Sequence, residues 1–316
     1  MNQLMLDILH VTQEAALAAS PWVGRGRKME ADDAATTAMR RVLQLIPMAG
    51  TVVIGEGELD EAPMLYIGEK LGTGSGPQLD IAVDPLEGTN LVAGGMDNST
   101  AVIALAPRGT LLHAPDMYME KLAVGRAAAG FIDLEAPLVD NVIHTARALG
   151  KRMENMTVMI QYRDRHEQAI EAVRATGARV RLFDDGDVTC SIAAAIESSG
   201  IDLFYGIGGA PEGVISAVAI QCLGGEMQAR LLPATTFEYE RCVGMGLSDP
   251  NRVLTLRDMV ATEECIFAAT GITPGLLLNG ITTESGLGAV THSLLTNGQP
   301  NAVHFIRTIH SSREVG

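Results

Sequence analysis

The amino-acid sequence predicts a mixed α/β fold in which helices pack against sheets. Its second half alternates short apolar runs, which are typical of buried strands, with segments of helical periodicity, and this switching favours helices layered on a sheet. The composition agrees, because 47% of the residues are hydrophobic, 34 are glycine and only 4% are aromatic, as in α/β proteins rich in tight turns. With 316 residues the chain can bury a large core, in one large domain or in two lobes.

Two helices are expected at the start of the chain. Apolar residues recur at helical spacing between Leu4 and Ala18, and Pro21 ends that pattern. A basic turn at residues 24–28 precedes a second predicted helix, over residues 31–45. Asp32 falls near its first turn, where a carboxylate complements the helix dipole and needs no further explanation.

Apolar runs in the rest of the first half predict four strands, at residues 51–54, 79–83, 100–106 and 117–124. The second of them is expected to end at Pro85, because proline cannot donate to a sheet ladder. A predicted helix at 140–149 is followed by Gly150 and a polar segment, which form the best candidate boundary between lobes. We therefore predict an N-terminal lobe of residues 1–150 and a C-terminal lobe of residues 151–316.

The second half of the chain alternates predicted strands and helices. The strands are expected at residues 157–160, 178–183, 203–207, 265–269, 288–294 and 302–309, and the helices at 165–176, 188–196 and 214–223. Pro211 suits the first position of the last helix, and the free N–H groups of such a helix start bind anions. Glu212 in the same turn would either complement the helix dipole or complete a metal site.

Carboxylates gather at the ends of two predicted strands. Asp84 and Glu87 follow the strand at 79–83, and the seven residues after Ile54 include four carboxylates. Ligands of open α/β sheets lie at the carboxyl ends of strands, and carboxylate oxygens suit Mg²⁺ or Mn²⁺. An exposed acidic loop with solvated charges is the alternative explanation of either segment taken alone.

Charge and hydropathy exclude two classes of partner. The net charge of −15 argues against a nucleic-acid-binding protein, since such proteins need basic patches. We expect no membrane association, because no apolar run approaches the length of a membrane span and the start of the chain lacks the pattern of a signal peptide. The four cysteines show no C-x-x-C spacing and are expected to be reduced and structural, with the cytoplasm as the expected location.

The segment Asp84-Pro85-Leu86-Glu87-Gly88-Thr89 resembles the metal motif of the lithium-sensitive, Mg²⁺-dependent sugar phosphatase superfamily. Five other segments resemble, in family order, the class II bacterial fructose-1,6-bisphosphatases; they lie at residues 53–58, 62–65, 114–119, 185–187 and 208–213. The similarity runs from about Val11 to about Ile309. It implies a layered α-β-α-β-α sandwich, of the α+β kind, with the site between two lobes. In this interpretation the lobe of residues 1–150 binds the metal ions and the lobe of residues 151–316 binds the sugar phosphate.

The resemblance also implies a phosphatase site that holds two or more Mn²⁺ or Mg²⁺ ions. By position, it assigns the metal ligands to Asp32, Glu56, Asp84, Glu87 and Glu212. It gives the catalytic roles to Lys28, which stabilises charge, to Glu58 and Asp60 as acid or base candidates, and to Thr89, which orients the attacking water. The segments that would contact the substrate hold Glu87, Gly88, Thr89, Tyr118, Arg163, Asp164, Arg165, Asp185, Gly186, Asp187 and Gly209.

The reaction implied by the resemblance is hydrolysis of the 1-phosphate of a sugar bisphosphate, foremost fructose 1,6-bisphosphate in gluconeogenesis, by a homo-oligomer (dimer or tetramer). Arg163 and Arg165 would bind the distal phosphate, and Asp185 and Asp187 the sugar hydroxyls. Alternatives are sedoheptulose 1,7-bisphosphate, another sugar or cyclitol phosphate, and a non-catalytic sugar-phosphate-binding regulator, against which the retained ligand set argues. Departures from the family pattern bear on which sugar is bound; they are Arg27, Asp33, residues 94–98 and the shortened segment at 231–240.

Overall fold

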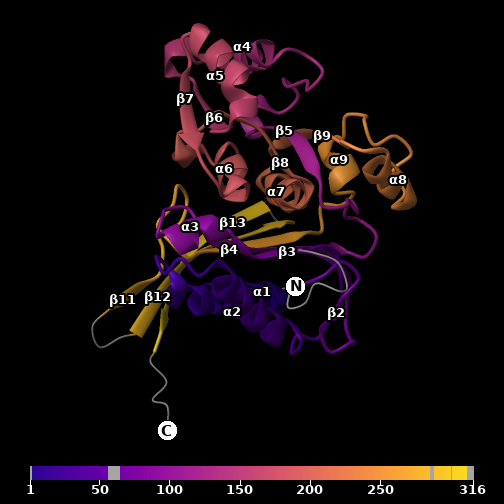
Figure 1. The fold of residues 1–316 in the computed structure, drawn as a ribbon, viewed down its shortest axis with the longest axis vertical. Coiled ribbons are helices and arrows are strands. Elements are labelled where there is room, and N and C mark those ends of the chain that lie inside the picture. Colours follow the sequence, from indigo (N-terminus) through magenta and orange to yellow (C-terminus); the bar gives the residue numbers. More distant parts are fainter. Residues whose placement is uncertain (1, 56–64, 285–287, 300, 312–316) are drawn as a thin grey trace.

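The computed structural model describes residues 2–55, 65–284, 288–299 and 301–311. Its elements form five layers, which Figure 1 shows one above another: helices, an eight-stranded sheet, helices, a five-stranded sheet and helices. The first sheet has the strand order β11-β12-β10-β4-β3-β1-β2, with β13 paired to β12, and the second has the order β7-β6-β8-β5-β9. The α-β-α-β-α arrangement predicted from the sequence is therefore confirmed.

The first sheet takes its strands from both ends of the chain. These are β1 (Ala49–Ile54), β2 (Lys70–Leu71), β3 (Gln78–Glu87), β4 (Thr100–Pro107), β10 (Ile266–Gly271), β11 (Thr282–Glu284), β12 (Gly288–Gly298) and β13 (Asn301–His310). The second sheet comes from the middle of the chain and consists of β5 (Tyr118–Val124), β6 (Thr157–Gln161), β7 (Arg179–Phe183), β8 (Leu203–Gly209) and β9 (Glu226–Leu231).

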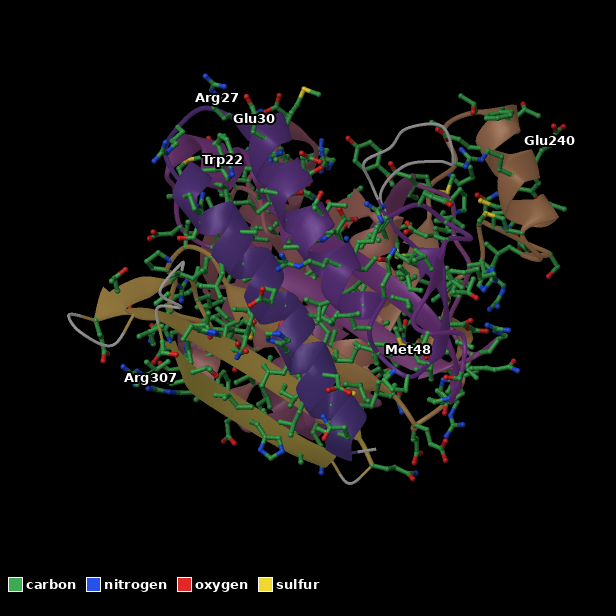
Figure 2. The ribbon with its side chains drawn as sticks, turned by 90° about the horizontal axis from the view of Figure 1, so that it is seen from below. Trp22, Arg27, Glu30, Met48, Glu240 and Arg307 are labelled. Carbon is green, nitrogen blue, oxygen red and sulfur yellow. The ribbon has the colours of Figure 1, made fainter. Side chains whose placement is uncertain are left out.

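The helices that pack on the sheets form three layers. Figure 2 shows α1 (Asn2–Ala19) and α2 (Lys28–Leu43) lying across the outer face of the first sheet. Between the sheets lie α6 (Asp187–Ala193) and α7 (Ala210–Leu223), and outside the second sheet lie α4 (Leu138–Ala148) and α5 (Glu167–Ala175). The other α-helices of the described residues are α3 (Thr89–Gly94), α8 (Thr236–Gly244) and α9 (Leu256–Met259). Within the described ranges, no helix is long and apolar enough to cross a membrane.

Three hydrophobic cores fill the interfaces between the layers, and one of them surrounds the middle helices on both sides. The strand β4 shows why, because its side chains alternate between the two faces of the sheet. Ile103 and Leu105 join the core beneath α1 and α2, whereas Val102 and Ala104 join the core around α7. A third core lies between the second sheet and α4 and α5. The central strands are therefore apolar on both faces, which the sequence shows as continuous apolar runs.

The division of the chain near residue 150 does not follow the division between the sheets. The strand β5 and the helix α4 precede residue 150 but belong to the second sheet and its outer layer, and β10 to β13 return to the first sheet. The reason is non-local pairing, because β10 inserts between β4 and β12. The two sheets with their helices therefore do not correspond to residues 1–150 and residues 151–316.

Several boundaries differ from the prediction, and two of them bear on the site. We expected Pro85 to end β3, but β3 continues to Glu87, and its pairing with β4 shifts register between Asp84 and Glu87. Proline is tolerated in such a bulge because no ladder hydrogen bond is required of it there. The helix α2 begins at Lys28 instead of residue 31, so that Asp32 lies beyond its first turn. The sequence patterns also missed the short elements β2, β9, β11, α3, α8 and α9.

His166 attaches the turn before α5 to the end of β8. Its Nε2 accepts a hydrogen bond from the amide of Ile207 at 2.8 Å, and its side chain is buried. Burial, together with the neighbouring Arg165 guanidinium, lowers the pKa of His166 to about 4. The imidazole is therefore neutral at pH 7, with its proton on Nδ1.

We expect His166 to contribute a stability that is complete above pH 6.5 and is lost as the pH falls through about 4. The sign follows because the unfolded histidine binds its proton first, at its ordinary pKa of 6.5. Urea unfolding of His166→Gln at pH 7 and pH 4.5 should show a flatter pH dependence than the wild type. His144→Gln, at an exposed histidine, is the control, and equal slopes for all three proteins would contradict the assignment.

Candidate active site

Three carboxylates from distant parts of the chain meet between the two sheets. Asp84 and Glu87 lie at the bulged end of β3, and Glu212 lies in the first turn of α7. One oxygen atom from each side chain lies within 4.8 Å of those from the other two. Three carboxylates in this arrangement have the oxygen chemistry and the spacing that a divalent cation requires.

Local backbone structure positions the three side chains. The Asp84 carboxylate accepts a hydrogen bond from the Leu86 amide at 3.0 Å, which closes the bulge of β3 around Pro85. Gly209 caps the start of α7, and a side chain there would overlap the Glu212 carboxylate. The carboxylates thus depend on a bulge in one sheet and on a glycine at the end of a strand of the other.

The electrostatics of the cluster favour a bound cation. Burial raises the pKa of Glu212 to about 8, and the carboxylates of Asp187 and Glu87 add to this rise. Burial likewise raises the pKa of Glu87. In the described part of the chain, Oε2 of Glu212 and Oδ1 of Asp187 are buried without a hydrogen-bond partner. Such oxygens are costly to bury, and a divalent metal ion would satisfy them, so the residues present fit a metal site.

Lys121 brings a buried positive charge to the cluster. This residue was not among those predicted for the site. The side chain is 1% exposed, its Nζ contacts the Asp187 carboxylate, and it donates to the Gly209 carbonyl at 2.9 Å. A signal was present, because Lys121 shares one face of β5 with Met119 and Ala123, which are both in the core between the sheets. A lysine on a buried strand face requires a partner charge.

A cavity of about 330 Å³ adjoins the carboxylate cluster. Its lining includes Asp84, Glu212 and ten of the eleven residues predicted to contact substrate, which are Glu87, Gly88, Thr89, Tyr118, Arg163, Arg165, Asp185, Gly186, Asp187 and Gly209. Asp164 is the exception, because it is exposed and is not among the residues that line the cavity. The lining also contains residues that the sequence analysis did not single out: Asn90, Gln161 and Gly208.

Two arginines bring positive charge to the wall formed by the second sheet. The guanidinium carbon of Arg165 lies 5.0 Å from the centre of the Tyr118 ring, and Nε of Arg165 donates to the Ile207 carbonyl at 3.0 Å. Arg163 forms an ion pair with Asp185. A cavity lined by both carboxylates and arginines can bind an anion through the arginines and through a metal ion held by the carboxylates.

Asn90 connects the two halves of the site. Its side-chain carbonyl contacts Nζ of Lys28 on α2, and its amide donates to the Asp185 carboxylate at 3.2 Å. Lys28 is exposed and is not one of the described residues that line the cavity. The contacts from Lys28 through Asn90 to Asp185 nevertheless link α2 to the loop before α6.

The other predicted residues are placed as follows. Thr89 begins α3, and its hydroxyl donates to the Leu86 carbonyl at 3.2 Å. Among the described residues, Asp32 is not one of the three carboxylates that meet; its Oδ1 is buried without a partner, and burial raises its pKa. The remaining three lie outside the described residues: Glu56, Glu58 and Asp60.

We expect Lys121→Met to destabilise the metal-free protein by about 3–5 kcal/mol, because it leaves the Asp187 charge buried without its partner. Lys70→Met makes the same change at an exposed lysine and should stay within about 0.5 kcal/mol of the wild type. Adding Asp187→Asn to Lys121→Met should recover part of the loss. Urea unfolding in EDTA measures all three, and equal small losses for both lysines would contradict the role given to Lys121.

Comparison with known proteins shows the family to which the chain belongs. The family described as bacterial fructose-1,6-bisphosphatase, glpX-encoded, matches residues 2–310. The chain is 47% identical to fructose-1,6-bisphosphatase 1 class 2 of Escherichia coli (strain K12), over 98% of this chain and 95% of that protein. It is 46% identical to fructose-1,6-bisphosphatase class 2 of Haemophilus influenzae, over 97% and 96% of the two chains. The chain therefore belongs to the glpX-encoded family of bacterial fructose-1,6-bisphosphatases.

Proposed function

We propose that this protein hydrolyses the 1-phosphate of fructose 1,6-bisphosphate, with the aid of divalent metal ions, and releases fructose 6-phosphate and phosphate in gluconeogenesis. The observation that carries the proposal is the cluster of Asp84, Glu87 and Glu212 beside a cavity that two arginines also line. The family membership and the names of its relatives support the same substrate.

The carboxylates would hold the metal ions. Bound divalent ions at such a site neutralise phosphoryl oxygens and lower the pKa of water. Asp84, Glu87 and Glu212 would ligate the first ion, and we propose that Asp32 and Glu56 extend the ligand set to a second. The unpartnered Oδ1 of Asp32 supports this extension. We propose Mn²⁺ or Mg²⁺, because oxygen ligands suit both ions.

The chain's own groups would position the water and the leaving group. We propose that the Thr89 hydroxyl, which lies at the start of α3 and lines the cavity, orients the attacking water. Glu58 and Asp60 are the proposed acid and base candidates, and Lys28 would stabilise developing charge.

The other end of the substrate would bind to groups from the second sheet and its loops. A guanidinium fork makes a strong, charge-assisted contact with a phosphate, and we propose Arg163 and Arg165 for the distal phosphate. Asp185 and Asp187 would accept hydrogen bonds from sugar hydroxyls. The location of all four in the cavity lining supports this assignment.

A different sugar phosphate is the second candidate, suggested by the departures from the family pattern at Arg27 and Asp33. Both residues lie on the surface: Arg27 pairs with Glu30 at the start of α2, as Figure 2 shows, and Asp33 is exposed beside α1. Neither belongs to the described lining of the cavity, which favours fructose 1,6-bisphosphate. Phosphate release with Mn²⁺ or Mg²⁺ across a panel that includes sedoheptulose 1,7-bisphosphate and inositol phosphates distinguishes the candidates by kcat/KM.

We further propose a homo-oligomer located in the cytoplasm. All four cysteines are buried and unbridged, although the sulfur atoms of Cys222 and Cys265 lie only 3.4 Å apart. Free thiols so close together support a reducing compartment.

We expect Asp84→Asn to lower kcat/KM by at least about 100-fold, the loss typical even of groups that only support a metal ligand. The fold should persist, and the metal-free variant should melt at the wild-type temperature or above it, because a repelling charge is removed. Asp140→Asn, on the exposed surface of α4, should leave activity unchanged. A near-native kcat for Asp84→Asn at limiting metal would show that Asp84 is not a ligand.

We expect Arg165→Ala to lower kcat/KM for a bisphosphate by the equivalent of about 2–4 kcal/mol. This is the loss typical of removing one partner from a charge pair that becomes buried and hydrogen-bonded on binding. The loss should be much smaller for a monophosphate, which has no second phosphate to bind. The monophosphate also controls for structural damage. Arg165 donates a hydrogen bond to the Ile207 carbonyl in the free protein, and the loss of that bond would affect both substrates equally. An equal loss on both substrates would make Arg165 a structural residue.

A further inference from the structure

The strand β13 forms a long free edge of the first sheet. It pairs with β12 over its whole length, from Gly298 opposite Asn301 to Ala289 opposite His310. No described strand pairs with its other side. Figure 2 shows the yellow β12 and β13 at the margin of the molecule, with Arg307 beside them. The backbone groups that point away from β12 along such an edge are a template for another strand.

The backbone groups that face this free edge can be identified. The Gly298 amide donates to the Cys265 carbonyl, so Gly298 faces β10 and Asn297 faces β13. Because successive residues of an antiparallel ladder alternate sides, Ala302, its partner, faces β12. The odd-numbered residues of β13, from 303 to 309, therefore direct their N–H and C=O groups outward.

The side chains of these odd-numbered residues share one face and are largely apolar. Val303, Phe305 and Ile309 are 44%, 46% and 43% exposed, and Arg307 completes the row. The strand contains no proline, lysine or acidic residue, which are the devices that usually protect an edge. An apolar edge without such protection is expected to be covered.

We propose that β13 is a self-association surface, on which β13 of a second copy pairs antiparallel about a two-fold axis and joins two eight-stranded sheets into one. The axis passes through Ile306. In this register the odd residues of both copies face each other, Val303 lies opposite Ile309 of the partner subunit, and Phe305 lies opposite the partner subunit's Arg307.

The row of outward-facing side chains on β13 favours a second copy of this strand as the partner and a two-fold axis at Ile306. Arg307 forms an ion pair with Glu284 of its own chain. An axis through Arg307 would still set two guanidinium groups opposite each other, and like charges in that position destabilise a sheet. An axis through Ile306 instead gives two apolar pairs and two contacts between an arginine and an aromatic ring. The strand is thus complementary to itself, as a two-fold interface requires.

A charge exchange across the axis tests the proposal with the full-length protein. Residues 303 and 309 of one chain lie about 20 Å apart. Charges introduced at both positions therefore interact with each other only across the contact between two subunits. Val303→Lys with Ile309→Lys sets lysine against lysine, and the dissociation constant of this contact should rise about 100-fold or more. Val303→Lys with Ile309→Glu sets lysine against glutamate and should restore assembly.

Sedimentation equilibrium at micromolar concentration measures the mass of each variant. The wild type should be a dimer or a larger even oligomer, the double-lysine variant should lose one two-fold association step, and the lysine–glutamate variant should regain it. Leu6→Lys with Leu45→Lys removes two other exposed leucines and should keep the wild-type mass. A monomeric wild type, an unchanged mass for the double-lysine variant or a failure of the lysine–glutamate variant would each overturn the proposal.

A proline variant decides the matter if the charged variants fold poorly. Phe305→Pro removes an N–H group that faces the free edge and leaves the hydrogen bonds to β12 intact, the one place where a sheet tolerates proline. It should lose the same association step while circular dichroism shows an unchanged fold. A Phe305→Pro protein that keeps the wild-type mass would exclude pairing through β13.

Discussion

Carboxylate burial between two sheets is the constraint on which the site depends. Burial raises the pKa of Glu87 and of Glu212, the neighbouring Asp187 carboxylate adds to both rises, and the buried charge of Lys121 opposes them. The same burial that makes the metal-free cluster unfavourable makes it selective for a small divalent cation. The metal-free protein is therefore less stable than it would be without the cluster, because only a bound metal ion balances the charge of the carboxylates.

The helix α7 makes this burial possible. It packs against both sheets, and apolar residues surround it on all sides, so its first turn is held rigidly between the layers. Glu212 at that turn meets the end of β3, while Gly209 before it lets the chain approach the Glu212 carboxylate closely. A shift of either sheet would separate the three oxygens, which couples the integrity of the layered fold to the geometry of the site.

The sequence predicted the features that depend on local pattern. The mixed α/β character, most strands and the position of Pro211 in the first turn of α7 agree with the structure, whereas the order of the five layers was implied by the family resemblance. It did not predict the course of β3 past Pro85, because the bulge exists only against β4, nor the burial of Lys121, because its partners lie on α6 and at the end of β8. The pairing of β10 with β4 is likewise non-local, because the two strands lie far apart in the chain.

The return of β10 to β13 to the first sheet determines the order in which the protein can be completed during synthesis. The strands of the second sheet are all made before β10 leaves the ribosome, so that sheet can form while the chain grows. The strand β4 beside β3 must wait for the last part of the chain to cover its open side. Until then the nascent chain exposes an unpaired, apolar strand edge, which promotes misfolding. Translation that stops before β10 is complete therefore yields an aggregation-prone chain without a finished first sheet.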